Sequence, residues 1–373
     1  MTDRPVPLDE YPVHQAPLSM RYVATSDRNA YDRCIFHVFD HHGRALLILG
    51  LGVYPNTGVI DAFATLRLGD RLHAVRASDA LTDDRMRMAV GPFTITVDAP
   101  LERFTLRCDA DPADPEALSY DLTWQGDFPP LWEPHHTMRR GDRLILEGRR
   151  FVQAGTPGGV IRVRGEEIAV GGGEWTGTRD RSWGVRPIPG EDGGRSGEEH
   201  IPEGFHWLWC PVRFEDRFVM VLVQEDADGY RTTGDAVEVR TGRPDAQLGW
   251  PHADITYRSG TRHPERAVIH LTDRNRKPLE LTAEILASSP LSVGAGYPPA
   301  DEWSHGTWRG RGWCDRRVYD LSDPAAHPLA AFGVTDHAAR FTLDGATGYG
   351  IFEHGSFGRH DPSGFTGYDS VAP

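Results

Sequence analysis

Thr335-Asp-His-Ala-Ala-Arg-Phe-Thr-Leu343, then Asp344-Gly345, then Ala346-Thr-Gly-Tyr-Gly-Ile-Phe-Glu353, is the clearest hairpin signal in the chain. Asp-Gly favours a type I′ turn, because both central residues of that turn need positive φ. Breakers are dense elsewhere too: 41 Gly and 28 Pro in 373 residues are roughly 18%, against about 12% in ordinary proteins. The composition therefore predicts an all-β or mostly β fold. It excludes helical bundles, coiled coils and doubly wound sheets as the main architecture.

The length of the hairpin loop decides which titratable side chains face each other. A two-residue loop places Asp336 opposite Glu353, whereas a four-residue loop places His337 opposite His354. Facing carboxylates would raise the pKa of one of them. We expect these residues to orient a polar end of a substrate if they close a cavity; the alternative is a solvated sheet rim.

Further strands are expected at short spacing along the chain. The predicted strands Phe93–Val97 and Arg103–Cys108 alternate as half-buried antiparallel strands do. Leu279–Ser289 allows either a strand or one short helix. We predict an extended arm over 1–19, a first β domain over 20–234 and a second over 235–373. The other predicted strands are Cys34–Asp40, Ala45–Val53, Gly58–Leu68, Met86–Val90, Leu118–Trp124, Asp142–Gln153, Gly159–Arg164, Glu167–Val170, Phe205–Phe214, Arg217–Gln224, Ala236–Arg240, Ala253–Arg258, Ala267–Leu271, Trp303–Trp308 and Trp313–Tyr319.

Charge and cysteine usage limit the partners and the compartment. The net charge of −14 disfavours nucleic acid as a partner. Four separated cysteines form no CxxC pair, so a zinc ribbon is excluded. The N-terminus has no apolar signal region, and the longest apolar run, Ala45–Tyr54, is too short to span a membrane. We therefore expect a cytoplasmic protein with reduced thiols and no membrane span.

The motif Gly177-Thr-Arg-Asp-Arg-Ser-Trp-Gly-Val-Arg186 concentrates groups that can carry chemistry. Asp180 under the indole of Trp183 would be an acid whose pKa is raised by apolar surroundings. Because the two residues are three apart, they share a face only if the strand bulges. Arg179 or Arg181 would assist the acid. The alternative is an ion pair between Asp180 and an arginine, with Trp183 in the core.

The stretch Phe205-His-Trp-Leu-Trp-Cys210 places three aromatic side chains on one face of a strand. Trp207 and Trp209 would form either a core wall or a platform for a ligand. His206, on the opposite face, is an alternative general acid or base, since its ordinary pKa suits proton transfer near neutrality. It too has a purely structural alternative. A loop of 18 residues over 187–204 precedes this stretch and is long enough for a lid or a binding loop.

The sequence contains none of the common metal-binding, nucleotide-binding or serine-nucleophile motifs that we searched for. We find no HExxH motif, no 12-residue calcium loop, no Gly-x-Ser-x-Gly elbow and no Walker loop. We therefore expect no metal and no cofactor.

The motif around Asp180 also carries a family resemblance. Together with Phe151-Val-Gln-Ala-Gly155, Trp207-Leu-Trp209 and the C-terminal hairpin, it resembles the carotenoid 1,2-hydratase (hydroxyneurosporene synthase) superfamily. The resemblance covers roughly the last 220 residues. It implies two lipocalin-like antiparallel β-barrel or sandwich modules with few short helices. It also implies hydration of isoprenoid double bonds or cyclisation of polyenes, with Asp180 as the acid and Trp183 as its neighbour.

Three functions follow as hypotheses. The first is a hydratase, lyase, isomerase or cyclase that acts without a cofactor on a hydrophobic terpenoid, polyene or polycyclic molecule. The second is a cytoplasmic lipocalin-like carrier of a hydrophobic ligand, and the third is a carbohydrate-active or carbohydrate-binding β-sandwich; a homodimer is left open. The enzyme hypothesis uses Asp180, Arg181, His206 and Glu353 as catalytic groups, and Arg179, Trp183, Arg186, Trp207, Trp209, Asp336 and His337 as substrate-binding groups.

Overall fold

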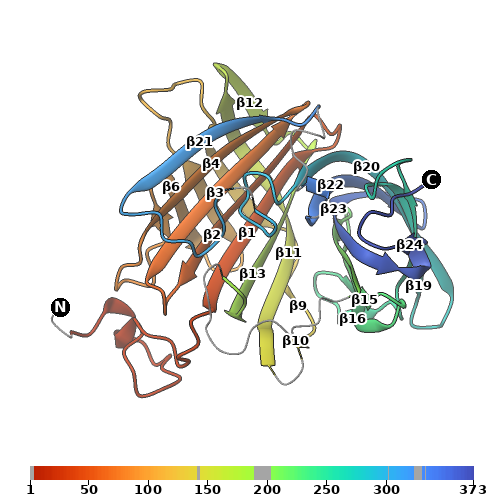
Figure 1. Cartoon of the computed structure of the whole chain (residues 1–373), viewed down its shortest axis with the longest axis horizontal. Helices are drawn as coiled ribbons and strands as arrows, with labels where there is room; N and C mark the ends of the chain where they lie inside the picture. The colour runs from red at the N-terminus through yellow and green to blue at the C-terminus, as the bar shows by residue number, and fades with distance from the viewer. Residues whose placement is uncertain (1–3, 141–142, 189–202, 301, 323–329, 332) are drawn as a thin grey trace.

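The protein consists of two curled antiparallel β-sheets packed side by side (Figure 1). The helical segments of its described residues are short 3₁₀ turns such as η1 (Pro7–Glu10) and η4 (Asp361–Ser363). The computed structural model describes residues 4–140, 143–188, 203–300, 302–322, 330–331 and 333–373. The prediction of an all-β protein with two lipocalin-like modules is confirmed. None of the helices described in these ranges is long and apolar enough to cross a membrane.

The first sheet contains most of the N-terminal half and curls so that β5 approaches β3 and β4. Its order is β21-β4-β3-β2-β1-β13-β11-β8-β7-β6-β5, with β9, β10 and β12 paired to β11. The strands are β1 (Ala30–Asp40), β2 (Ala45–Tyr54), β3 (Val59–Leu68), β4 (Arg71–Ala80), β5 (Ala89–Val90), β6 (Phe93–Ala99), β7 (Arg103–Cys108), β8 (Ser119–Gly126), β9 (Leu131–Trp132), β10 (His136–Arg140), β11 (Arg143–Val163), β12 (Glu166–Val170), β13 (Trp175–Val185) and β21 (Trp313–Asp320).

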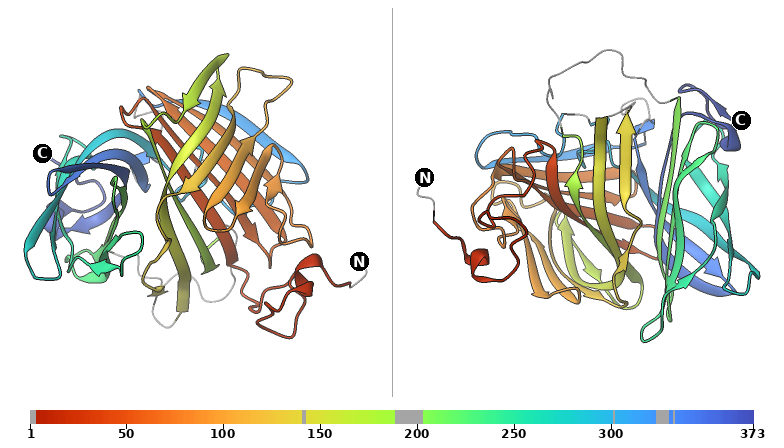
Figure 2. Two further views of the ribbon diagram at one scale, coloured as in Figure 1. Left: turned by 180° about the vertical axis from the view of Figure 1, so that it is seen from behind. Right: turned by 90° about the horizontal axis from the view of Figure 1, so that it is seen from below.

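The second sheet has the order β17-β16-β15-β14-β23-β22-β20-β19-β18, with β24 paired to β23. Its central strands β14 and β23 face β11 and β13 of the first sheet (Figure 2). The strands are β14 (Gly204–Arg213), β15 (Phe218–Asp226), β16 (Arg231–Val239), β17 (Ala246–Gln247), β18 (His252–Tyr257), β19 (Pro264–Thr272), β20 (Pro278–Pro290), β22 (Thr335–Leu343), β23 (Ala346–His360) and β24 (Phe365–Thr366).

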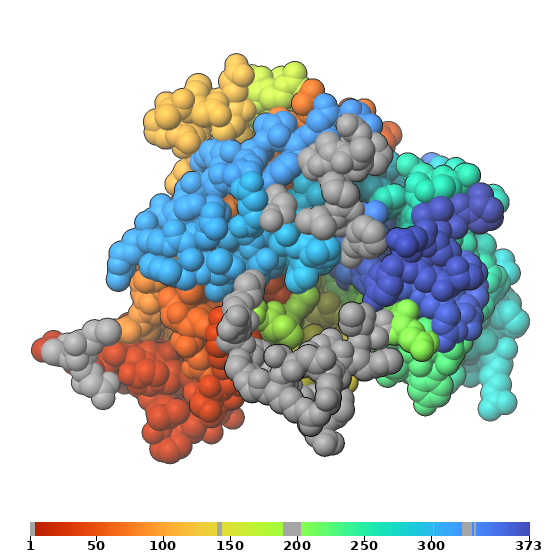
Figure 3. All heavy atoms as spheres, viewed as in Figure 1, coloured from red at the N-terminus to blue at the C-terminus, as the bar shows by residue number. Residues whose placement is uncertain are grey.

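The chain passes from one sheet to the other at points that differ from the predicted domain boundary at 234/235. β14, β15 and the first four residues of β16 lie before that boundary but belong to the second sheet. β21 lies after it but pairs with β4 in the first sheet, with Trp313 opposite Ser78. In the space-filling view, the chain around β21 extends over the strands of the first sheet (Figure 3). The chain therefore passes between the two sheets three times, after β13, after β20 and after β21.

Several local predictions need correction. β4 was not predicted; its charged residues hide its pattern, although Arg76 is buried. Trp303–Trp308 is irregular rather than a strand, and Leu279–Ser289 is a strand rather than a helix. The arm predicted as extended folds back on itself, because the Asp9 carboxylate accepts hydrogen bonds from the Met20 amide at 2.6 Å and from Ser19 Oγ at 2.7 Å.

Among the described residues, three large apolar layers hold the protein together, beside a small cluster around Tyr54. One fills the first sheet's concave side, around Phe36 and Trp124, and another fills that of the second sheet, around Leu208 and Phe341. The third lies between the sheets and includes Trp209, which is 1% exposed. Residues that alternate along β13 and β14 therefore point either into a module or toward the interface between the modules.

The C-terminal hairpin has the two-residue loop. Asp344 and Gly345 have φ of 50° and 78°, the signs that a type I′ turn requires. Asp336 on β22 pairs directly with Glu353 on β23. This register, one of the two expected from the sequence, places both carboxyl groups between the sheets.

Candidate functional site

A cavity of about 250 Å³ lies between the two sheets, where β1, β11 and β13 face β14, β22 and β23. Apolar side chains form much of its wall, and charged groups gather in two parts of it. Its lining residues are Arg33, Ile35, His37, Ile48, His136, Met138, Leu146, Arg150, Asp180, Ser182, Arg186, Phe205, Trp207, Leu291, Tyr297, Val334, Asp336 and Glu353.

The first charged part is the carboxyl pair of the hairpin, Asp336 and Glu353. Asp336 is 1% exposed, and its Oδ2 lies 2.9 Å from Nε2 of His37 on β1. Thr178 Oγ1 lies 3.0 Å from the other ring nitrogen of His37. The hydroxyl can donate to Nδ1, which leaves the Nε2 proton for Asp336. Glu353 accepts a hydrogen bond from Nε1 of Trp207. Two modules thus hold one carboxyl pair.

Asp180 on β13 is the third buried carboxyl group of the cavity, at 8% exposure. Arg150, on the neighbouring strand β11, lines the same cavity and donates through Nε to Glu133 at 2.5 Å. Glu133 also accepts from Nε1 of Trp209 at 2.6 Å. Arg150 is therefore held beside the carboxyl groups by an acceptor outside the cavity.

Burial raises the pKa values of all three carboxyl groups. The pKa of Glu353 rises to about 8, first through burial and then through the charge of Asp336. Burial raises the pKa of Asp336 to about 7, and that of Asp180 to about 6 against the opposing charge of Arg150. Burial lowers the pKa of His37 to about 4, so this ring is neutral. Near neutral pH the site therefore offers a protonated carboxylic acid close to groups that can be ionised.

The second charged part consists of two arginines around an aromatic ring. The guanidinium carbons of Arg33 and Arg186 lie 5.4 Å and 5.5 Å from the ring centre of Tyr297. Arg33 is 6% exposed, and within the described part of the chain no carboxylate forms an ion pair with either arginine. Burial, followed by the charge of Arg33, lowers the pKa of Arg186. The charge of the buried carboxylate of Asp61 acts on Arg33 without forming an ion pair with it. Two guanidinium groups held together in this way can bind an anion.

Five of the residues predicted from the sequence line this cavity together: Asp180, Arg186, Trp207, Asp336 and Glu353. Trp209 does not line the cavity. It lies in the apolar layer between the sheets and donates a hydrogen bond to Glu133, which also accepts from Arg150. On β14 the three aromatic residues face the interface, as the alternation predicted.

Five other predicted residues lie elsewhere. β13 pairs with β1 without a bulge, so Trp183 points away from Asp180 and packs against Trp132 and Phe151. The interpretation of Trp183 as a lid over Asp180 is therefore wrong. By the same alternation, Arg179 points into the first module, where its side chain donates to Gln153 and packs on aromatic rings. Arg181 points to the same side and forms an ion pair with Asp32 at 3.0 Å.

His206 and His337 point into the second module rather than toward the cavity. His337 Nδ1 lies 2.7 Å from Ser288 Oγ. His206 stacks on His360 in a separate pocket, so it is not a general acid or base of this site. Most of the loop predicted over 187–204 lies outside the described residues.

Sequence reasoning missed His37, Arg33, Arg150, His136 and Tyr297, which also line the cavity. These residues come from β1, β10, β11 and the segment after β20, and they stand in ordinary strand or loop contexts. His37 and Asp336 are 299 positions apart. The signal that could have identified His37 and Arg33 is polar residues at interface-facing positions of an otherwise apolar central strand.

The fold and the site define a class of protein: two lipocalin-like β modules with a cavity between them that is lined by both carboxyl groups and arginines. The chain belongs to a family of unknown function, DUF8625, whose model matches residues 6–366. A comparison with curated proteins found no match.

Several solved structures are similar to this chain. A proposed AttH protein from Nitrosomonas europaea has a TM-score of 0.55 at 14% identity, over 94% of this chain and 98% of that one. Kievitone hydratase from Nectria haematococca has a TM-score of 0.49 at 12% identity, over 88% and 89%. CghA with Sch210972 has a TM-score of 0.46 at 12% identity, over 90% and 89%. The first likeness supports the fold that the sequence resemblance implied.

Proposed function

We propose that this protein is an enzyme of the hydratase, lyase, isomerase or cyclase type that acts by proton transfer in the cavity between the sheets. The observation that carries the proposal is the Glu353–Asp336 pair, which sits in a cavity with a pKa of about 8 on Glu353. A carboxylic acid that stays protonated at neutral pH can act as a general acid. A structural ion pair would lower the pKa of a carboxyl group instead.

The proposed proton path uses the three carboxyl groups in two roles. Glu353 donates its proton to an alkene carbon, a leaving oxygen or a carbonyl oxygen of the substrate. Asp180, whose pKa of about 6 leaves it mainly ionised at pH 7, accepts a proton from a water molecule or from a carbon of the substrate. Proton transfer from Asp180 to Glu353 through the substrate site or solvent restores the starting state. Asp336, held by His37, keeps Glu353 protonated.

The substrate we propose is a compact, largely apolar molecule with one anionic oxygen group. Arg33 and Arg186 supply the cationic end of the cavity, which suits a carboxylate or an enolate. Ile35, Ile48 and Leu291 contact the apolar part. A volume of about 250 Å³ lies just below the roughly 300–1,000 Å³ of drug-sized sites, which favours one or two fused rings over an extended polyene.

Hydrogen exchange in heavy water tests this proposal without knowledge of the physiological substrate. The purified protein is incubated in D₂O with a panel of unsaturated cyclic and aryl carboxylic acids, and products are followed by mass spectrometry. We expect deuterium incorporation or a mass change of one water for at least one compound. Glu353→Gln should reduce the rate at least a hundredfold, in line with the loss of a general acid.

Trp183→Phe is the matched control, because Trp183 lies outside the cavity on a strand that contributes to it. Its rate should stay within twofold of the wild type. Compounds that bind but never exchange, in the wild type and in Glu353→Gln alike, would instead identify a carrier. An unchanged rate in Glu353→Gln would refute the proposed role of this residue.

A further inference from the structure

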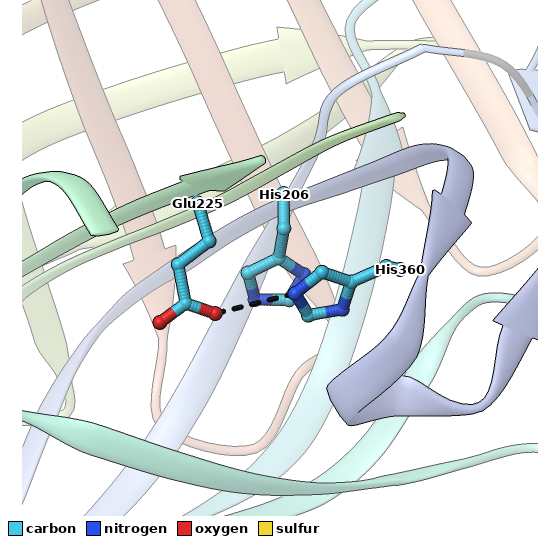
Figure 4. A group of neighbouring side chains, drawn as sticks. All are labelled: His206, Glu225 and His360. Atoms are coloured by element: carbon cyan, nitrogen blue, oxygen red, sulfur yellow. Dashed lines mark hydrogen bonds and ion pairs between the residues drawn. The ribbon is translucent and has the colours of Figure 1, made fainter. Parts of the chain in front are cut away.

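A second polar cluster lies on the other face of the strands that carry Trp207 and Glu353. It consists of His206 on β14, Glu225 on β15 and His360 at the end of β23, and the three side chains point toward one another (Figure 4). One donor atom of each residue lies within 4.8 Å of the donor atoms of the other two. The cluster borders a pocket of about 170 Å³ that is separate from the cavity between the sheets.

The hydrogen bonds of this cluster leave donor atoms available. His360 Nε2 lies 3.2 Å from Glu225 Oε2, while Glu225 Oε1 accepts from Arg231 at 2.6 Å. His206 is 4% exposed, and its Nδ1 has no hydrogen-bond partner among the described residues. A buried polar atom without a partner costs free energy, so its persistence calls for a ligand or another function.

We propose that His206, Glu225 and His360 bind one divalent transition-metal ion of the zinc type. Two imidazole nitrogens and one carboxylate oxygen form a donor set that suits Zn²⁺ and its neighbours in the first transition row rather than Mg²⁺ or Ca²⁺. With metal–ligand bonds of about 2.0–2.1 Å, tetrahedral donors lie roughly 3.3 Å apart. His360 Nε2 and Glu225 Oε2 already lie 3.2 Å apart, so the adjustment falls mainly on His206, whose donor atom lies within 4.8 Å of the other two.

The arrangement of the two imidazole rings determines which movement metal binding requires. The rings of His206 and His360 stack at 4.1 Å with 6° between their planes, so their in-plane lone pairs run side by side. Binding therefore requires one ring to rotate out of the stack. Ser363 Oγ lies 2.8 Å from Nδ1 of His360 and is placed to orient this ring from the outer side, as partners of metal-bound histidines do.

The residues around the cluster provide a path for an ion from the surface and a second carboxylate, Asp254. His252 and Asp254 line the same pocket and are more than half exposed, so the pocket reaches the surface. Arg231 is a competing cation on Glu225, but it occupies only one of the two carboxylate oxygens. A bound ion would join three strands of the second sheet behind the wall that carries Trp207. We did not expect a metal from the sequence, because the three residues are far apart and match no ligand motif.

Titration of the full-length protein with Zn²⁺ after removal of metals by a chelator tests the proposal. We expect one equivalent to bind, with a rise in the melting temperature, and at least a tenfold weaker affinity in His360→Gln and Glu225→Gln. His42→Gln is the matched control, since His42 is an exposed histidine in the turn after β1, on the other sheet. It should leave the affinity within twofold of the wild type.

X-ray absorption of the zinc-loaded wild type gives a measurement that does not depend on variant folding. We expect two imidazole ligands and at least one oxygen ligand in the first shell. The proposal is overturned if no equivalent binds, or if the first shell holds fewer than two imidazoles. It is also overturned if folded His360→Gln binds Zn²⁺ as tightly as the wild type.

Discussion

Glu353 and Asp336 face each other between the sheets, and their protonation links stability to pH. Their pKa values of about 8 and about 7 lie above the ordinary 4.5 and 3.8, so the folded protein retains protons that the unfolded chain releases. The contribution of the pair to the free energy of unfolding is therefore complete below about pH 4. It is lost as the pH rises to about 8.

Urea unfolding of the wild type and Glu353→Gln between pH 5 and pH 9 measures this effect. The amide mimics the protonated acid but cannot ionise, so the wild type should lose stability relative to the variant across this range. Glu284→Gln, an exposed glutamate paired with Arg340, should follow the wild-type pH dependence. Parallel curves for the wild type and Glu353→Gln would show that Glu353 has an ordinary pKa.

Arg186 tests the anionic end of the proposed substrate. A charge-assisted hydrogen bond contributes about 1.5–3 kcal/mol, so Arg186→Gln should weaken a bound carboxylic acid by about tenfold or more. The methyl ester of the same acid should bind the wild type and the variant within threefold. Calorimetry on both compounds checks this expectation, and equal losses for acid and ester would contradict an ionic contact.

Residue types and spacing predicted part of the site. Asp180 and Arg186 stood out because their motif concentrates charged groups within ten residues, and Asp336 and Glu353 because a two-residue turn places them opposite each other. Trp183 was misplaced, because its position relative to Asp180 depended on a bulge that β13 does not have. His37 could not be found, because only the packing of the two sheets brings it to Asp336.

At the scale of elements, the turn of the C-terminal hairpin fixes the register that places Asp336 opposite Glu353. Gly345 has a φ of 78°, which a β-branched residue adopts only with strain. Gly345→Val should therefore lower the free energy of unfolding by about 1–3 kcal/mol. Gly345→Asn should change it much less, because asparagine tolerates the left-handed region. Chemical denaturation measures both, and equal losses would mean that the turn conformation does not set the cost.

Local signals predicted most strands well, and the reason is physical. Alternation and turn residues are encoded within a few positions, so β7 was predicted at its observed bounds and the C-terminal hairpin in one of its two allowed registers. Strand partners across the chain are not encoded locally. The pairing of β21 with β4 therefore went unpredicted, and so did the membership of β14 and β15 in the second sheet.

At the scale of the whole molecule, the interface layer should make the two sheets unfold together. Trp209 is 1% exposed within this layer, and the chain passes between the sheets both after β13 and around β21. We expect one calorimetric transition. Trp209→Ala should move that transition down without splitting it, with a loss of about 3–5 kcal/mol. Trp250→Ala, at a residue 74% exposed, is the control and should cause little change. Two separated transitions would contradict this coupling.

The central claim is that the cavity between the sheets holds a carboxylic acid that stays protonated at neutral pH. Infrared difference spectroscopy of the wild type against Glu353→Gln detects the protonated carboxyl band directly and needs no substrate. We predict that this band is present at pH 7 and disappears as the pH rises through about 8. Its absence at pH 7, with ionisation of Glu353 complete by about pH 5.5, would contradict the account.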